Sequence, residues 1–181
     1  MAEARPPVPV LLVAAVFSRH ADALCWARGR LEEAYGPVER VSTPFVFNQT
    51  DYYAAAMGTD LRKQFLVFRD LLLPDRLAAI KLHANALEQE LAGADRYPEE
   101  RPVNIDPGYL NLGKFVLATT KDQAHRVYLG QGVYAEVTLR FQAGAFVPWP
   151  WTYADYRQPA VLEFLRDARA SYHDRLRTAR P

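Results

Sequence analysis

The pattern of apolar and polar positions predicts a mixture of strands and helices. Val8 to Phe17 is an almost continuous apolar run, which is typical of a strand buried on both faces. Apolar residues recur at helical spacing over residues 21–35 and 74–92, and a glycine follows each segment. Residues 38–47 alternate with a period of two, and Pro44 within them indicates either a strand at a sheet edge or a bulge.

The second half of the chain is richer in predicted strands. Strand-like runs cover residues 64–69, 103–105, 115–120, 125–129 and 133–141. Asp106, Pro107 and Gly108 have the residue types of a type II turn. Residues 146–156 are rich in proline and tryptophan, and we expect this loop to close one end of the core. Apolar positions from Val161 to Tyr172 predict a final amphipathic helix.

These elements predict an α+β fold with a ferredoxin-like βαββαβ core, because the first six occur in that order. A C-terminal β-hairpin and a helix extend this core. The alternative is another α+β sandwich with a mixed sheet. Residues 1–7 are expected to form a disordered tail, and residues 8–181 a single α+β domain.

The predicted hairpin has glycines at positions 130 and 132 in its turn. A three-residue turn places Leu129 opposite Val133, Tyr128 opposite Tyr134 and Arg126 opposite Glu136. The apolar face, which includes Val127 and Leu129, is expected to pack on the core. Arg126 and Glu136 are expected to form a cross-strand ion pair.

Composition and motifs exclude several classes of function. The chain has 181 residues and a net charge of +1, so no overall positive charge favours nucleic acid. No apolar run approaches the roughly 20 residues of a membrane span, and the N-terminus matches a signal peptide poorly. The single cysteine, Cys25, is expected to be a small buried residue of a helix, which fits a cytoplasmic protein without a membrane partner.

Motifs for common cofactors and nucleophiles are also missing from the sequence. It contains no phosphate-binding loop, no dinucleotide-binding fingerprint and no nucleophile elbow. Its histidines and carboxylates match no metal-ligand spacing, so we expect no metal site. The sequence leaves the cofactor unknown and does not decide whether the protein is an enzyme.

Side chains able to do chemistry are concentrated between residues 104 and 136. We interpret this segment as a site for a small anionic ligand, phosphorylated or carboxylated, over a polar sheet face. The candidate catalytic residues are Asp106, His125 and Glu136, and the candidate ligand-binding residues are Asn104, Lys114, Thr119, Thr120, Lys121, Arg126 and Tyr134.

Other interpretations of the same residues remain open. Asp106 also fits a turn residue, and the threonines also fit strand-end caps. A module that binds RNA or a protein without catalysis is the alternative function, with Tyr128, Tyr134 and the tryptophan loop as stacking residues. A domain without any small ligand is a third interpretation.

Several segments resemble a bacterial family known as domain of unknown function 4416. They are Asn104–Tyr109, Val116–Lys121, His125–Arg126 with Tyr128–Leu129, Gly132–Leu139 and Trp151–Arg157. The resemblance covers most of the chain from Pro9 onward. It implies a bacterial, intracellular protein, and it implies no activity, cofactor or catalytic residue.

Overall fold

The computed structural model describes residues 1, 3–50 and 52–178. Residue 2 of the expected tail and residues 51 and 179–181 of the expected domain lie outside these ranges. The strands are β1 (Val10–Ser18), β2 (Val38–Val41), β3 (Phe45–Val46), β4 (Arg62–Leu72), β5 (Asn104–Leu110), β6 (Lys114–Thr119), β7 (Val127–Gly130), β8 (Val133–Gln142) and β9 (Ala145–Pro148). The helices are α1 (Ala21–Tyr35), α2 (Ala54–Met57), α3 (Leu77–Ala92) and α4 (Pro159–Thr178), with 3₁₀ turns at Pro74–Arg76 and Ala154–Arg157.

All the strands belong to one sheet, in which every pair is antiparallel. Its order is β2-β4-β1-β5-β6-β8-β7, with β3 paired to β4 and β9 paired to β8. The mixture of helices and strands expected from the sequence is confirmed. Among the described helices, none has the length and apolar character needed to cross a bilayer.

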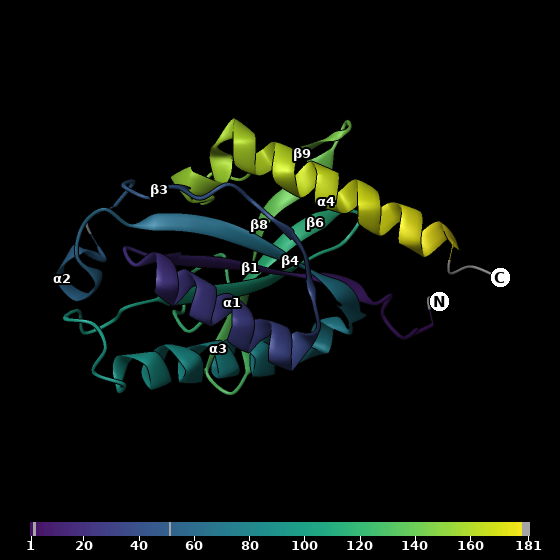
Figure 1. Cartoon of the computed structure of the whole chain (residues 1–181). Coiled ribbons are helices and arrows are strands. Elements are labelled where there is room, and N and C mark those ends of the chain that lie inside the picture. The colour runs from purple at the N-terminus through teal and green to yellow at the C-terminus, as the bar shows by residue number, and fades with distance from the viewer. Residues whose placement is uncertain (2, 51, 179–181) are drawn as a thin grey trace.

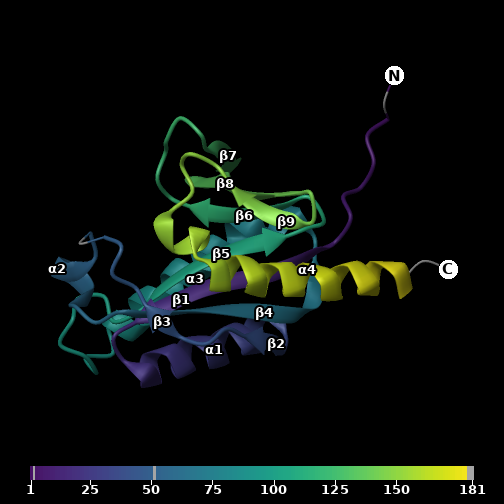
Figure 2. The same ribbon diagram turned by 90° about the horizontal axis from the view of Figure 1, so that it is seen from above.

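Helices cover both faces of the central strands. Helices α1 and α3 lie on one face and α4 lies on the other (Figure 1), and the view from above shows α4 crossing the sheet (Figure 2). Alternate residues of β1 pack toward the two sides, Leu12 toward α1 and α3 and Leu11 toward α4. All of β1 is therefore buried, which explains its continuous apolar sequence.

The first helix is confirmed, but its cysteine is placed differently from the prediction. Helix α1 buries Ala23, Leu24, Ala27 and Leu31, whereas Cys25 is exposed. The prediction that Cys25 is buried is wrong, because one residue turns a helix by about 100° and carries this position away from the apolar stripe.

Residues 38–47 form two short strands rather than one. Both β2 and β3 pair only with β4, so the edge position that Pro44 indicates is confirmed. Part of the predicted tryptophan loop is also a strand, because β9 pairs with β8.

The predicted turn at Asp106, Pro107 and Gly108 is wrong, because β5 runs straight through these residues. Gly108 is required for close approach of the neighbouring strand and not for a turn. A Cβ atom at this position would lie 2.3 Å from the carbonyl oxygen of Val116 in β6.

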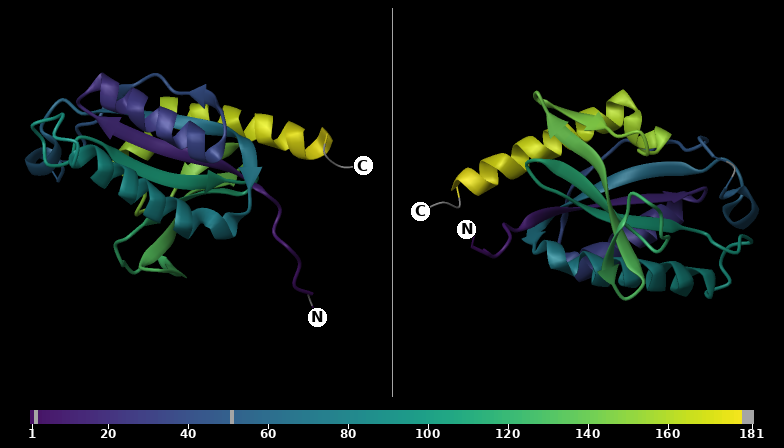
Figure 3. Two further views of the ribbon diagram at one scale, coloured as in Figure 1. Left: turned by 60° about the horizontal axis from the view of Figure 1, so that its bottom comes forward. Right: turned by 180° about the vertical axis from the view of Figure 1, so that it is seen from behind.

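The β7–β8 hairpin is confirmed, and its register differs from the prediction only beside the turn. Tyr128 lies opposite Tyr134 as predicted, but Gly130, not Leu129, lies opposite Val133. Val127 and Leu129 are exposed, so the prediction that they pack on the core is wrong. The reason is that β7 is the outermost strand and that none of the helices in the described part of the chain covers it (Figure 3).

Candidate functional site

A cleft opens where β5 and β6 separate. These strands pair only between Gly108–Leu110 and Phe115–Leu117. Nearer the start of β5, side chains of α3 take the place of β6. The amide of Ile105 donates to Glu88 at 2.6 Å, and its carbonyl accepts from Nζ of Lys81 at 2.9 Å. Pro107 is the next residue of β5 whose backbone groups point to this side. Proline has no N–H group, so Pro107 needs no hydrogen-bond acceptor from a neighbouring strand.

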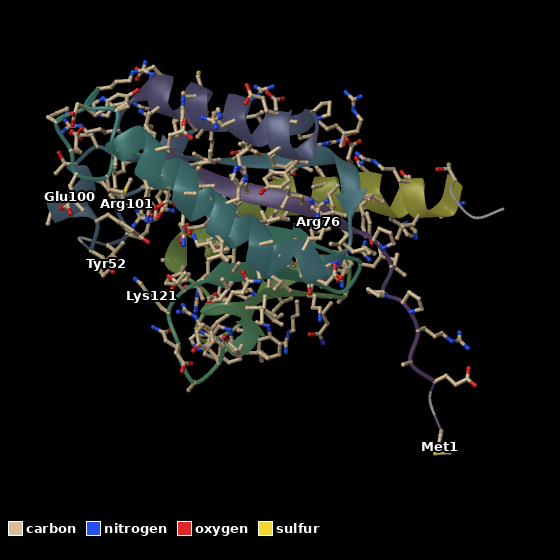
Figure 4. The ribbon with its side chains drawn as sticks, turned by 90° about the horizontal axis from the view of Figure 1, so that it is seen from below. Met1, Tyr52, Arg76, Glu100, Arg101 and Lys121 are labelled. Carbon is tan, nitrogen blue, oxygen red and sulfur yellow. The ribbon has the colours of Figure 1, made fainter. Side chains whose placement is uncertain are left out.

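The cleft contains a cavity of about 470 Å³ at one end of the sheet. Tyr52, Arg101 and Lys121 mark this end, and Met1 and Arg76 lie at the opposite end of the molecule (Figure 4). The cavity is lined by Phe17, Phe47, Gln49, Thr50, Tyr52, Tyr53, Lys63, Lys81, Asn85, Arg101, Asn104, Asp106, Leu117, Ala118, Thr119, Thr120, Lys121, Gln123, Arg126, Glu136, Tyr153, Ala154, Asp155 and Tyr156. Its volume is in the range of small-molecule sites in proteins.

Among the described residues, three carboxylates line the cavity, and an ion pair holds each of them. Nζ of Lys63 lies 2.6 Å from Asp155, and Nζ of Lys81 lies 3.1 Å from Asp106. Nε of Arg126 lies 2.9 Å from Glu136. The side chains of the first and third pairs are almost completely buried, whereas 27% of the Asp106 side chain is exposed. Asp106 is therefore the carboxylate most open to a ligand.

A network of side-chain hydrogen bonds surrounds the start of β5. Arg101 donates to Glu88 at 2.6 Å and also to Oδ1 of Asn104, and Nδ2 of Asn104 donates to Asp106 at 2.7 Å. Burial raises the pKa of Glu88, although Lys81 and Arg101 oppose this effect. This network holds the side chains of Asn104 and Asp106 on the same side of β5.

Two opposing effects act on the pKa of Asp106. Burial alone would raise it, but the charges of Lys81 and Lys63 and the hydrogen bonds from Lys81 and Asn104 outweigh burial. The pKa of Asp106 is therefore lowered, and the side chain is a carboxylate at neutral pH.

Aromatic rings surround the ammonium group of Lys63. This group lies 4.5 Å from the centre of the Tyr156 ring and 5.3 Å from that of Phe17. Burial raises the pKa of Tyr156, and the nearby charge of Asp155 adds to this shift. Cation–π contacts and the ion pair with Asp155 together stabilise the charge of Lys63, which is costly to bury.

The mouth of the cleft combines a cation with an exposed aromatic ring. Nζ of Lys121 lies 3.9 Å from the centre of the Tyr52 ring and lowers the pKa of the Tyr52 hydroxyl. Arg126 holds the loop that carries Lys121, since it donates to the carbonyl of Lys121 at 2.9 Å and to the Tyr153 hydroxyl at 2.7 Å. All three nitrogens of the Arg126 guanidinium thus have protein partners.

The structure brings together seven of the ten candidate residues from the sequence. Asn104, Asp106, Thr119, Thr120, Lys121, Arg126 and Glu136 line the cavity. They face a cleft between strands and not an open sheet face, because helices cover the central sheet on both sides.

The other three candidates lie outside the cavity lining. Lys114 lies at the opposite end of β6 from Thr119. Nε2 of His125 lies 3.3 Å from Glu136, and its ring stacks on Trp151 at 5.3 Å. Tyr134 contacts Tyr128, with ring centres 5.2 Å apart.

The sequence interpretation missed Lys63, Lys81, Arg101 and Asp155. The sequence could have indicated Lys81, because Lys81, Asn85 and Glu88 form a polar stripe at helical spacing beside the apolar stripe of α3. Lys63 and Asp155 carried none, because 92 residues separate them in the chain.

The model of the family described as Domain of unknown function (DUF4416) matches residues 8–172. No curated protein and no solved structure matches the chain. The matched range contains all the strands given above and all the described residues that line the cavity. The chain therefore belongs to the DUF4416 family.

Proposed function

We propose that this protein binds a small phosphorylated or carboxylated ligand in the cleft between β5 and β6. The observation that carries the proposal is the charge of the cavity lining. Among the described residues of the lining, five are cationic, Lys63, Lys81, Arg101, Lys121 and Arg126, and three are carboxylates. Glu88 lies outside the lining and pairs with Arg101, so Lys121 is the lining cation without a carboxylate partner among the described residues. The excess of positive charge is local, because the net charge of the whole chain is only +1.

Two of the five cations support the proposal most strongly. Arg101 uses Nε and Nη2 on Glu88 and Asn104, so its Nη1 retains donors for a ligand. Among the described residues, no carboxylate pairs with Lys121, and its ammonium group rests on Tyr52 at the mouth. Thr119 and Thr120 precede Lys121 and add hydroxyl groups.

The candidate proton-transfer residues support binding better than catalysis. A general base works best with a pKa near the working pH, and the pKa of Asp106 is lowered instead. Glu136 is only 1% exposed and is held by Arg126, His125 and Thr138. We therefore propose that Asp106 and Glu136 orient other groups and that no proton transfer depends on them.

An RNA-binding function has less support. The ferredoxin-like modules that bind single-stranded RNA present stacking aromatics on an open sheet face. Here both faces of β1 are buried beneath helices. We nevertheless propose that the β1-α1-β2-β4-α3-β5 part is ferredoxin-like, on the basis of its strand order β2-β4-β1-β5.

The test is a thermal-shift screen with phosphorylated and carboxylated small molecules, followed by titration calorimetry of hits at two salt concentrations. We expect Lys121→Met to weaken binding of a hit about tenfold, which corresponds to about 1.4 kcal/mol. Lys114→Met is the matched control, since it removes the lysine at the opposite end of β6, which does not line the cavity. Equal binding by both variants, or no hit in the screen, would contradict the proposal.

A further inference from the structure

We propose that the ligand of this cleft is a polyhydroxylated anion, such as a sugar phosphate or a sugar acid. The inference rests on the proposed anion site and adds the second half of the ligand. The cavity that offers cationic donors at Arg101 and Lys121 also exposes an acceptor, the carboxylate of Asp106. A complementary ligand needs a negative group that binds the cations and hydrogen-bond donors that bind the carboxylate of Asp106.

The carboxylate of Asp106 has acceptor positions that the protein leaves open. Its Oδ1 accepts from Lys81 at 3.1 Å, and its Oδ2 accepts from Asn104 at 2.7 Å. An ionised carboxylate has about four acceptor positions, so about two remain. The exposed 27% of this side chain faces the cavity, which places those positions within reach of a ligand.

The groups around Asp106 suit hydroxyls better than they suit a second anion. A ligand that brought only negative charge to this end would meet a carboxylate of the same sign. Hydroxyl groups donate to a carboxylate in strong charge-assisted bonds and also accept from amides and hydroxyls. Asn85 and Thr119 line the same cavity and supply such groups.

The other two carboxylates do not compete for this role. Glu136 and Asp155 are 1% and 4% exposed, and each is bonded to a cation within 3 Å. Asp106 is consequently the residue that we expect to distinguish a hydroxylated anion from an alkyl anion.

The experiment compares two matched pairs of probes by titration calorimetry of the full chain. Ribose 5-phosphate is compared with pentyl phosphate, and gluconate is compared with hexanoate. We expect the hydroxylated member of at least one pair to bind about tenfold or more tightly than its alkyl counterpart. The pair that shows the difference identifies the anion as phosphate or carboxylate.

A substitution of Asp106 gives a second readout, because it should change the affinities for the hydroxylated and alkyl probes differently. Asp106→Asn should weaken binding of the hydroxylated probe about tenfold and leave the alkyl probe equally tight or tighter, because a repelling charge is removed. Alkyl probes that bind as tightly as hydroxylated ones to the unaltered protein would overturn the inference while leaving the anion site intact. A complete lack of binding by all four probes would overturn the anion site as well.

Discussion

Individual charges of the cleft are arranged as pairs whose members depend on each other. Lys63 and Asp155 are both about 4% exposed and lie 2.6 Å apart. Removal of one partner leaves the other buried without compensation, which costs about 3–5 kcal/mol in comparable pairs. We expect Lys63→Met to reduce the free energy of unfolding by about this amount, measured by urea denaturation.

The double variant Lys63→Met with Asp155→Leu is the control for this effect. It removes both charges, so it should recover much of the lost stability. A single variant that loses less than about 1 kcal/mol would show that the pair is not buried in solution as it is here.

Asp106 should make stability depend on pH in a defined direction. Its pKa in the folded chain lies below the ordinary value of 3.8, so the unfolded chain binds a proton more readily. The carboxylate thus contributes stability that is complete above this ordinary value and is lost as the pH falls through the folded value. We expect wild type to be more stable than Asp106→Asn near neutral pH and this difference to shrink below about pH 4.

The measurement is the free energy of unfolding of both proteins as a function of pH. Asp106→Asn removes the titration of this one carboxylate, so carboxylates that do not interact with Asp106 cancel in the comparison. Glu88 does not cancel, because the charge of Asp106 raises its pKa. A difference that stays constant or grows in acid would contradict the ion pair between Lys81 and Asp106.

At the scale of elements, the contact between β5 and β6 depends on a glycine. Gly108→Ala would place Cβ against the backbone oxygen of Val116, at 2.3 Å, and backbone cannot move aside as a flexible side chain can. We expect a loss of about 1–3 kcal/mol, the usual cost of overpacking. Gly29→Ala in α1 is the control: it meets no atom within 4 Å and should add about 0.5–1 kcal/mol. Equal stability of the two variants in urea denaturation would contradict the close approach.

Elements governed by local pattern could be predicted from the sequence. The helices α1 and α3 and the buried strand β1 follow from periodicity and from glycines at the helix ends. The course of β5 could not, because Asp-Pro-Gly favours a turn locally, whereas contacts with β1, β6 and α3 hold it extended. The exposure of Val127 and Leu129 likewise depends on β7 being the last strand of the sheet, which no local pattern states.

Only part of the candidate site could be predicted from the sequence. The cluster from Asn104 to Glu136 is dense enough in sequence to be noticed, and most of it does line one cavity. Lys63 and Asp155 come from distant segments, and their meeting depends on the register of β4 against β1 and on the 3₁₀ turn after β9. A pattern of nearby residues cannot contain such a pair.

At the scale of the whole molecule, the sheet has two parts that meet along a short seam. One part contains β2, β4, β1 and β5, and the other contains β6, β8 and β7. Pairing at Gly108–Leu110 and Phe115–Leu117 joins them at one end, and the cavity occupies the other end. Because a ligand there contacts both parts, its binding should stabilise the whole chain through linkage.

Backbone amide NMR during titration with inorganic phosphate tests the central claim most directly, since it locates the anion without a known ligand. We expect saturable shifts at Asp106 and Thr119, on the two strands that flank the cleft, and at Lys121 in the loop after β6, with no shift at Lys114 or Arg76. Shifts that do not saturate, or that spread over the surface without a focus at the cleft, would contradict an anion site between β5 and β6.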